Sequence, residues 1–392
     1  MSMLLVNAGS SSLKISIAVD GEVIYGRSLA TSVSAMTDAE WEPLLAEFTA
    51  VADDIDVVVH RVAHGGRLFG EAAIVDDRVM AGIEELTDLA PLHQPPSVAT
   101  LERLRRMLPE ATQIACFDTA FHARMPAEAY TYAIPEEWRN VYGVRRYGFH
   151  GLAHEYNVRE AATILDRDLL ELRVVSAHLG SGASLAAVRD GHSVDTTMGF
   201  TPLEGLVMST RSGTIDPAVS AWLVANTDLS VREVITKLER ESGLLGLAGD
   251  TRMENIVERA ASAEPEAQLA LGVWSHRAAG MIGQMVISAG GLDALVFSGG
   301  IGEHSPVARA MILERLRPLG LRFDERLNQR NEMDREIQTE DSSAAIIVVA
   351  TREDITMVRQ AEALLWLREQ HEAEAEGQQP PLAPGEGQPA AP

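Results

Sequence analysis

A turn of small residues near the start of the chain ends in a lysine that could bind phosphate. Residues 7–14 read Asn-Ala-Gly-Ser-Ser-Ser-Leu-Lys, and among 33 basic residues only Lys14 and Lys237 are lysines. Lysine offers a compact point charge, whereas arginine offers a rigid planar fork. The N–H groups of a glycine-rich turn, followed by a point charge, suit the oxygens of a phosphate. We therefore predict a phosphate site at Lys14, whereas Lys237 lies in a helical pattern and is expected to be solvated.

The same arrangement occurs a second time in the chain. Asn-Ala-Gly-Ser at residues 7–10 is echoed by His-Leu-Gly-Ser at 178–181, and Val-Asp-Gly at 19–21 is echoed by Arg-Asp-Gly at 189–191. In both copies an apolar run, a Gly/Ser turn, a second apolar run and an Asp-Gly turn follow one another, which is typical of strands joined by tight turns. The matched order favours duplication over coincidence. Two such turns facing one cleft could bind the two ends of a polyphosphate.

Other segments place charged and imidazole side chains beside strand-like runs or in glycine-rich loops. Arg61 and Asp118 each follow an apolar run, and α/β enzymes bind ligands at strand ends. His93, His150 and Arg211 lie in loops rich in proline, aromatic or small residues, and a Gly-Gly-Ile-Gly sequence follows a further apolar run. Each of these features alone could be an ion pair, a helix cap or a turn. Their combination is hard to explain by architecture and indicates a functional site.

Short apolar runs alternate with helical patterns along most of the chain. Buried strands are predicted at residues 57–60, 113–117, 174–178, 294–298 and 345–350. Helices are predicted at residues 101–108, 151–165, 229–241, 269–289 and 355–370. This alternation predicts an α/β architecture. Residues 371–392 are rich in Glu, Gln, Gly, Pro and Ala and are predicted to be a disordered tail.

Composition limits the classes of function. A length of 392 residues suggests two domains, and a net charge of −24 argues against a nucleic acid or an anionic membrane as partner. The single Cys116 rules out an intramolecular disulfide and fits a reducing, cytoplasmic location. No apolar run approaches the length of a membrane span, and no basic segment typical of a signal peptide begins the chain. A zinc enzyme is disfavoured because one cysteine and scattered histidines lack ligand spacing.

Taken together, the motifs resemble those of the acetate kinase family, within the superfamily of actin, Hsp70 and sugar kinases. The resemblance spans roughly residues 3–360. Besides residues 7–14, it rests on His-Arg-Val at 60–62, Phe-Asp-Thr-Ala-Phe-His at 117–122, Tyr-Gly-Phe-His-Gly at 147–151 and Thr-Arg-Ser-Gly at 210–213. It implies reversible phosphoryl transfer from ATP to a short-chain carboxylate, chiefly acetate, giving acetyl phosphate and ADP. Mg²⁺ is the implied metal, for which Mn²⁺ could substitute.

The resemblance also implies an architecture. Members are usually homodimers, and each chain has two duplicated α/β domains with RNase H-like (actin-like ATPase) cores and a cleft between them. Here the N-terminal domain would comprise residues 1–148, completed by the helix at about 355–370. The nucleotide-binding C-terminal domain would comprise residues 149–354, and residues 371–392 would form the tail.

By the same resemblance, individual residues carry roles. Asp118, His150, Arg61 and Arg211 would be catalytic, with His150 stabilising the transition state. The substrate would contact Arg61, Ala63, Leu92, His93, Phe149 and Pro202. The nucleotide would contact Ser10, Ser12, Lys14, His178, Leu179, Gly180, Ser181, Gly182, Asp250, Thr251, Arg252, Gly299, Gly300, Ile301, Gly302 and Glu303. The metal region would contain Asn7 and Glu353.

The implied chemistry gives Asp118 an unusual task. A carboxylate substrate with a pKa near that of Asp or Glu is already ionised at neutral pH, so it needs no general base. Asp118 is therefore expected to orient an arginine or the Mg²⁺ shell. The negative charge spread over the transferred phosphoryl group would be neutralised by Arg61, Arg211, His150 and the metal.

Several positions depart from the usual text of the family. Asparagine, glycine or aspartate is usual where this chain has Gln94, Ser181, Ser209, Thr214 and His304. Ala63 stands where the family often has valine, and the extra room is worth on the order of 1–2 kcal/mol for an added methylene. Propionate is therefore expected to be used about as well as acetate, and a propionate-preferring kinase is an alternative.

Two readings from other classes stay open. An actin- or Hsp70-like ATPase would share the two phosphate turns but would not need Arg61, Asp118, His150 and Arg211 together. A catalytically weakened homologue with a regulatory role would explain the departures. A P-loop kinase is excluded, because neither lysine follows a glycine and the sequence Gly-Lys-Ser/Thr cannot occur.

Overall fold

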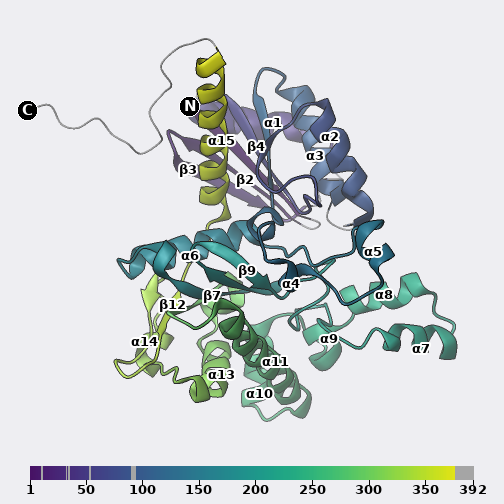
Figure 1. The fold of residues 1–392 in the computed structure, drawn as a ribbon, viewed down its shortest axis with the longest axis vertical. Coiled ribbons are helices and arrows are strands. Elements are labelled where there is room, and N and C mark those ends of the chain that lie inside the picture. Colours follow the sequence, from purple (N-terminus) through teal and green to yellow (C-terminus); the bar gives the residue numbers. More distant parts are fainter. Residues whose placement is uncertain (10–11, 32, 34–35, 53, 90–93, 376–392) are drawn as a thin grey trace, which may run out of the picture. The chain divides into compact units, whose positions relative to one another are not determined.

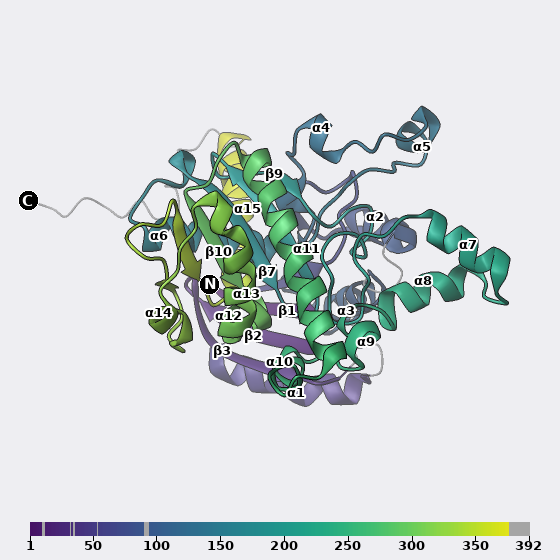
Figure 2. The ribbon, with the colours of Figure 1, turned by 90° about the horizontal axis from the view of Figure 1, so that it is seen from below.

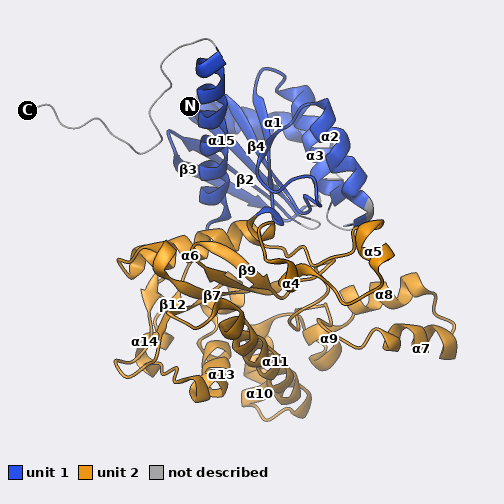
Figure 3. Cartoon of the chain, in the orientation of Figure 1, with its two compact units in different colours: residues 1–120, 352–392 blue, residues 121–351 orange. Residues whose placement is uncertain are grey.

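The computed structural model describes residues 1–375 except 10–11, 32, 34–35, 53 and 90–93 (Figure 1). The chain forms two compact units, coloured separately in Figure 3. Unit 1 comprises residues 1–120 and the chain from residue 352, and unit 2 comprises residues 121–351. Both units combine strands with helices, which confirms the predicted α/β class. Within the described ranges, no helix has the length and apolar character needed to cross a membrane.

Unit 1 is built around a six-stranded mixed sheet in the order β3-β2-β1-β4-β6-β5. Strands β1 (Ser2–Ala8), β2 (Leu13–Val19) and β3 (Glu22–Leu29) are antiparallel. Strands β4 (Val57–Val62) and β6 (Thr112–Phe117) continue from β1 in parallel, and β5 (Ala73–Ile74) forms an antiparallel edge. The parallel strands are mostly buried because they carry apolar side chains on both faces.

Helices cover both faces of this sheet. On one face, Trp41 and Phe48 of α1 (Asp38–Ala52) pack in one cluster with Leu4 and Val58. Helices α2 (Asp77–Glu85) and α3 (Gln94–Met107) supply Ile83 and Leu101 to a second cluster. Side chains alternate along a strand, so the intervening residues of β1 and β4 point to the other face. Helix α15 (Glu353–Ala375) packs against β1, β4 and β6 there.

Unit 2 contains a second six-stranded sheet, in the order β9-β8-β7-β10-β12-β11. Strands β7 (Arg173–Leu179), β8 (Ala183–Arg189) and β9 (His192–Thr196) are antiparallel. Strands β10 (Ala294–Ser298) and β12 (Ala345–Val348) continue from β7 in parallel, and β11 (Arg335–Glu336) is the antiparallel edge.

The long helix α11 (Pro265–Ala289) lies along β7, β8 and β9 (Figure 2) and packs on α13 (Pro306–Leu316). Helix α6 (Gly151–Ile164) contacts β7 and β10. The shorter α-helices of unit 2 are α4 (Ala127–Tyr130), α5 (Glu136–Asn140), α7 (Ala218–Asn226), α8 (Val231–Arg240), α9 (Gly243–Ala248), α10 (Met253–Ala261), α12 (Gly299–His304) and α14 (Glu325–Gln329). Single 3₁₀ turns cover Leu86–Leu89, Ala120–His122, Leu169–Glu171 and Arg317–Leu319.

The two sheets confirm the duplication predicted from the sequence, since strand order and strand direction are the same in both. Both Asp-Gly turns have two residues with positive φ, 50° and 85° for Asp20 and Gly21, and 53° and 72° for Asp190 and Gly191. This is the type I′ geometry that matches the twist of two paired strands. Each hairpin also has a register irregularity at the corresponding place, after Ile17 in one and after Ala187 in the other.

The five predicted strands and five predicted helices are all present, as β4, β6, β7, β10, β12, α3, α6, α8, α11 and α15. Helix α3 begins at Gln94 rather than at residue 101, because Pro95 and Pro96 occupy its first turn, where a missing N–H costs no hydrogen bond. Helix α15 continues to Ala375, so residues 371–375 of the predicted tail are helical. The rest of the predicted tail lies outside the described residues.

Unit 1 ends at Ala120, earlier than the predicted domain boundary after residue 148. The following segment bonds within unit 2 instead. The Arg146 Nη1 donates to the carbonyl oxygens of Thr197 and Met198 at 2.8 and 3.1 Å, and the Tyr147 N–H donates to Gly199 O at 3.0 Å. The later division falls after Thr351, three residues before the predicted end at 354.

Candidate functional site

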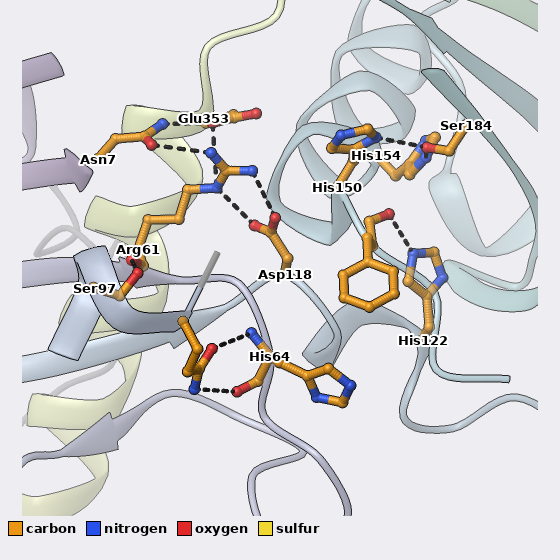
Figure 4. A network of polar contacts seen from close by, with 12 residues as sticks. Asn7, Arg61, His64, Ser97, Asp118, His122, His150, His154, Ser184 and Glu353 are labelled. Atoms are coloured by element: carbon orange, nitrogen blue, oxygen red, sulfur yellow. Dashed lines mark hydrogen bonds and ion pairs between the residues drawn. The ribbon is translucent and has the colours of Figure 1, made fainter. Parts of the chain in front are cut away.

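The first group of candidate residues meets at the carboxyl ends of β1, β4 and β6 in unit 1 (Figure 4). Arg61 Nε and Nη2 donate to the two carboxylate oxygens of Asp118 at 2.9 and 2.6 Å, and Arg61 Nη1 donates to Asn7 Oδ1 at 2.9 Å. Asn7 Nδ2 donates to Glu353 Oε2 at 2.9 Å, and this oxygen lies 3.8 Å from Arg61 Nε. Residues assigned to three different roles thus form one connected group.

These contacts hold the Arg61 guanidinium in one orientation. The Arg61 side chain is 23% exposed and that of Asp118 is 3% exposed. Burial disfavours the charge of Arg61, but the Asp118 and Glu353 carboxylates outweigh it and raise the pKa of Arg61 above its usual value. Asp118 and Asn7 take three of the five N–H bonds of the guanidinium. No described residue accepts a hydrogen bond from the other two, which can bind an oxyanion.

Helix α3 holds the loop that follows Arg61. The buried Gln94 side chain accepts a hydrogen bond from the His64 N–H at 3.2 Å and donates to His64 O at 3.1 Å. Ser97 Oγ donates to Arg61 O at 3.3 Å. Ala63 lies half-buried in this loop. The other two substrate residues predicted in this unit, Leu92 and His93, lie outside the described residues.

The first phosphate turn lies next to this group. The Gly9 N–H donates to Ser12 O at 2.8 Å, and Lys14 on β2 is paired with Asn7 on β1. Directly paired residues of neighbouring strands share a face of the sheet. Lys14 is exposed and forms no ion pair with any described residue, so its charge is available to an anion. Ser12 is half-buried, and Ser10 lies outside the described residues.

The second group of candidate residues lies in unit 2, around the turn of residues 178–182. A Cβ placed on Gly182 would lie 3.3 Å from His150 Nε2 and 3.5 Å from Arg211 Nη1, so both side chains border the backbone of this turn. Arg211 Nη1 also donates to Pro202 O at 3.4 Å. Burial lowers the pKa of Arg211. His150 and Arg211 thus place two nitrogen-bearing side chains beside the same glycine turn.

The backbone around His150 is strained and firmly held. His150 has φ 58° and ψ 27° at the start of α6, a conformation that is unfavourable for a residue with a Cβ. The preceding Phe149 is buried, and its carbonyl oxygen accepts a hydrogen bond from His122 Nε2 at 3.1 Å. The other His122 ring nitrogen lies 2.7 Å from Ser193 Oγ. These buried contacts fix the peptide that presents the imidazole of His150.

The predicted nucleotide contacts at residues 299–303 lie in a short helix, α12, and not in an open loop. The carboxylate of Glu303 helps to hold this helix in place. Its Oε1 accepts hydrogen bonds from the N–H groups of Gly299 at 2.8 Å and Thr351 at 3.3 Å. Gly299 has φ 75°, and a Cβ there would lie 2.9 Å from the backbone of Leu179. Glycine is therefore needed for the end of β10 to approach the second phosphate turn.

The predicted nucleotide contacts at residues 250–252 directly precede helix α10. The Asp250 carboxylate accepts hydrogen bonds from the Arg252 N–H at 2.9 Å and from Asn255 Nδ2 at 2.7 Å, which lower the pKa of Asp250. The carbonyl oxygen of Thr251 accepts a hydrogen bond from Ser209 Oγ at 3.1 Å. This bond joins the segment to the loop that carries Arg211. Ser209 N–H in turn donates to Ser181 O at 3.1 Å, so the loop is also tied to the second phosphate turn.

Sequence reasoning missed a set of buried polar residues behind the second phosphate turn. His154, Asn157, Ser176, Ser184 and Ser298 are all fully buried and bonded to one another or to His150 and His178. One sequence signal was available, because His154 follows His150 by four residues and must share its helix face. The serines lie on β7, at the start of β8 and at the end of β10, where nothing in the sequence distinguishes them.

No cluster of three or more His, Cys, Asp or Glu side chains that could hold a metal occurs among the described residues. Mg²⁺ keeps several waters and is usually bound by one or two carboxylates together with substrate phosphates. Asn7, Asp118 and Glu353 supply oxygen ligands of the right type within one group. These residues fit a Mg²⁺ ion that arrives with a nucleotide better than a permanently resident metal.

Comparison with known proteins extends these observations. The model of the Acetokinase family matches residues 42–359. An acetate kinase from Pseudothermotoga lettingae is 40% identical over 395 residues, which covers 93% of this chain and 98% of that protein.

Solved structures give the same result. A propionate kinase from Francisella tularensis superposes with a TM-score of 0.84 at 34% identity, covering 92% of this chain and 98% of that one. An acetate kinase from Porphyromonas gingivalis superposes with a TM-score of 0.84 at 31% identity, covering 93% and 99% of the two chains.

Proposed function

The chain belongs to the acetokinase family, and on this premise we propose that it phosphorylates acetate with ATP, reversibly, to give acetyl phosphate and ADP. The geometry that most supports this function is the guanidinium of Arg61, which Asp118 and Asn7 hold so that two N–H bonds remain for a carboxylate. An acetate oxygen would form a bond to the γ-phosphorus of ATP while the bond from that phosphorus to the β,γ-bridging oxygen breaks, and ADP would leave with the electron pair.

The proposed roles follow from charge. Arg61 would bind the acetate carboxylate, and Arg211 and His150 would donate hydrogen bonds to the phosphoryl oxygens as charge develops on them. Asp118 would hold Arg61, because both of its oxygens already accept hydrogen bonds from that side chain. Lys14 and the two glycine turns would bind the nucleotide phosphates. The carboxylate nucleophile is ionised at neutral pH, so no residue needs to remove a proton from it.

Mg²⁺, or Mn²⁺ in its place, is part of the proposal. When bound, the ion would neutralise phosphate charge, and Asn7 and Glu353 would hold it, directly or through water. A hydroxamate assay across formate, acetate, propionate and butyrate, with ATP or GTP and with or without Mg²⁺, tests the whole proposal. If no acyl phosphate forms and the rate of ATP hydrolysis does not depend on the carboxylate concentration, the result would favour an ATPase instead.

Ala63 is expected to allow propionate as well as acetate. We expect kcat/KM for the two acids to agree within about tenfold, and Ala63→Val to shift the preference toward acetate by a further factor of roughly ten, since one methylene is worth 1–3 kcal/mol in a closed site. Steady-state kinetics with both acids measure this. An acetate preference above about a hundredfold in the unchanged protein would contradict the role given to Ala63.

Lys14→Arg is expected to impair nucleotide use with little effect on the carboxylate. The planar guanidinium cannot replace a point charge at a tight turn, so we expect KM for ATP to rise by about tenfold and KM for acetate to stay within about twofold. Lys237→Arg is the matched control, because Lys237 is the other lysine and is paired with Glu241 on the exposed face of α8. A main effect on KM for acetate would show that Lys14 serves the other substrate.

A homodimer and a cytoplasmic location complete the proposal. Helix α7 supports the dimer, since its apolar Val219 and Trp222 are 41% and 63% exposed, and exposed apolar patches often mark interfaces. The buried Cys116, the single cysteine of the chain, is compatible with a reducing cytoplasm. Light scattering on the purified protein measures the assembly. A mass of a single 42.4-kDa chain would contradict the dimer.

A further inference from the structure

A row of buried hydrogen bonds runs from His150 into the interior of unit 2. His150 Nδ1 lies 2.9 Å from Ser184 Oγ, which lies 2.7 Å from His154 Nε2. The other nitrogen of His154, Nδ1, lies 2.8 Å from Ser176 Oγ. Figure 4 shows the outer part of this row, with His150, Ser184 and His154. His150 is therefore the outer end of a hydrogen-bonded row that continues into the interior of unit 2.

Asn157, on the same helix α6, joins this row to the second phosphate turn. Its Nδ2 donates to Ser176 Oγ at 3.2 Å and to Ser298 Oγ at 2.7 Å. Ser298 Oγ lies 3.1 Å from His178 Nδ1. The amide oxygen of Asn157 accepts a hydrogen bond from Thr351 Oγ1 at 2.9 Å. The amide group of Asn157 is thus connected through hydrogen bonds to both His150 and His178. The ring centroids of these two histidines are 5.0 Å apart.

The interior residues of the row have no access to solvent. Asn157, His154, Ser176, Ser184 and Ser298 each have an exposed fraction of 0%. Buried polar groups must find their partners within the protein, and each serine hydroxyl has one hydrogen to donate. His154 is neutral because burial, together with His122 and His178 nearby, lowers its pKa well below the usual value. The direction of every hydrogen bond in the row is therefore coupled to the next.

Toward His150 the direction follows from the amide nitrogen of Asn157, which can only donate. Ser176 Oγ accepts from it and, among the described residues, has only His154 Nδ1 as an acceptor for its own hydroxyl hydrogen. Neutral His154 then carries its hydrogen on Nε2 and donates it to Ser184 Oγ. Ser184 gives its own hydrogen to His150 Nδ1. The neutral form of His150 is left with its hydrogen on Nε2, the atom beside Gly182.

Toward His178 the same reasoning takes fewer steps. Ser298 Oγ accepts a hydrogen from Asn157 Nδ2 and gives its own hydrogen to His178 Nδ1. The neutral form of His178 therefore also carries its hydrogen on Nε2. The amide of Asn157 therefore favours the same tautomer, with hydrogen on Nε2, in both His150 and His178.

We propose that Asn157 is a positioning residue that makes His150 and His178 hydrogen-bond donors through Nε2 toward the phosphate-binding turn of residues 178–182. This inference rests on the proposed function and extends it, because a donor on His150 Nε2 is what a phosphoryl oxygen requires. A histidine with its hydrogen on Nδ1 would present a lone pair to that oxygen and repel it.

Neutron diffraction from crystals of the wild-type protein without substrate tests the assignment directly. Hydrogen is expected on Nε2 of His150, His154 and His178, and its presence on Nδ1 of His150 or His178 would overturn the proposal. Asn157→Asp replaces the donor by an acceptor and should reverse the row, moving the hydrogen of His150 and of His178 to Nδ1. Unchanged tautomers in this variant would also overturn it. These readouts do not depend on activity, so a failed kinase assay and a failed assignment are distinguishable.

Kinetics give a second readout. Asn157→Asp is expected to lower kcat by about a hundredfold, the usual cost of losing one transition-state donor, while KM for acetate stays within about threefold. If this variant does not fold, Ser184→Ala removes the hydroxyl that joins His154 Nε2 to His150 Nδ1 and leaves the contact of Ser298 with His178 in place. It should lower kcat in the same way. Ser275→Ala is the matched control, because Ser275 is an equally buried serine whose Oγ donates to Leu271 O within helix α11, outside the row. A kcat for Ser184→Ala equal to that of the control would overturn the proposal.

Discussion

Asp118→Asn is expected to lower kcat/KM for acetate by about a hundredfold or more, since misplacing a substrate-binding group by about an ångström has this effect. Both oxygens of Asp118 accept hydrogen bonds from Arg61. An asparagine offers one oxygen and turns a second donor toward Nε or Nη2 of the guanidinium, so one of the two bonds becomes a repulsive contact. Arg61 must then rotate away from Asn7. Steady-state kinetics with varied acetate and varied ATP separate this effect from any change in nucleotide affinity.

The chain offers a matched control for this substitution. Asp293 also binds an arginine through both oxygens, since Arg173 Nε and Nη2 donate to it at 2.8 and 3.2 Å. Asp293→Asn should leave all kinetic constants within about twofold, because surface ion pairs contribute only ~0–1 kcal/mol. Breaking the buried Arg61–Asp118 pair should in addition reduce the free energy of unfolding by about 3 kcal/mol. Near-normal acetate kinetics in Asp118→Asn, with Mg²⁺ affinity intact, would contradict the orienting role.

The arrangement of Arg61 and Asp118 shows what the sequence could predict. Both residues follow strand-like runs, and the carboxyl ends of neighbouring parallel strands lie at one edge of a sheet, so their proximity was foreseeable. The duplication was also foreseeable, because Asp-Gly pairs impose the same turn in both copies. The role of Asn7 as a bridge between Arg61 and Glu353 was not foreseeable. Glu353 comes close to β1 only because helix α15, near the other end of the chain, packs back on this sheet.

The remaining errors share a cause, which is that tertiary contacts override local pattern. Pro95 and Pro96 suggested a loop but open helix α3. The glycines at 299–302 suggested a loop but form α12, which the distant Thr351 N–H helps to fix through Glu303. The role of Asn157 was not predictable from the sequence, because an asparagine on a helix is ordinarily solvated. Its partners Ser176 and Ser298 are 19 and 141 positions away along the chain. Only the folded chain identifies it as a central polar residue.

Gly182→Val is expected to lower kcat by at least about a hundredfold, because displacing the proposed catalytic donors, His150 and Arg211, by a fraction of an ångström to an ångström would remove their alignment. A single Cβ would already lie 3.3 Å from both Cε1 and Nε2 of His150 and 3.5 Å from Arg211 Nη1. The two further methyl groups of valine would add to this crowding. Gly182 does not have a positive φ, so the loss would come from crowding and not from backbone strain.

A graded series makes this prediction sharp. Gly182→Ala adds only the first carbon and should lower kcat by roughly tenfold, while Gly182→Val lowers it much further. Gly272→Ala in helix α11 is the control, because a Cβ there meets nothing within 4 Å, and it should leave kcat unchanged. KM for acetate should change little across the series if Arg61 supplies the carboxylate contact. A Gly182→Val protein with normal kcat would mean that His150 and Arg211 do not act at this turn, and the proposed transition-state contacts would have to be placed elsewhere.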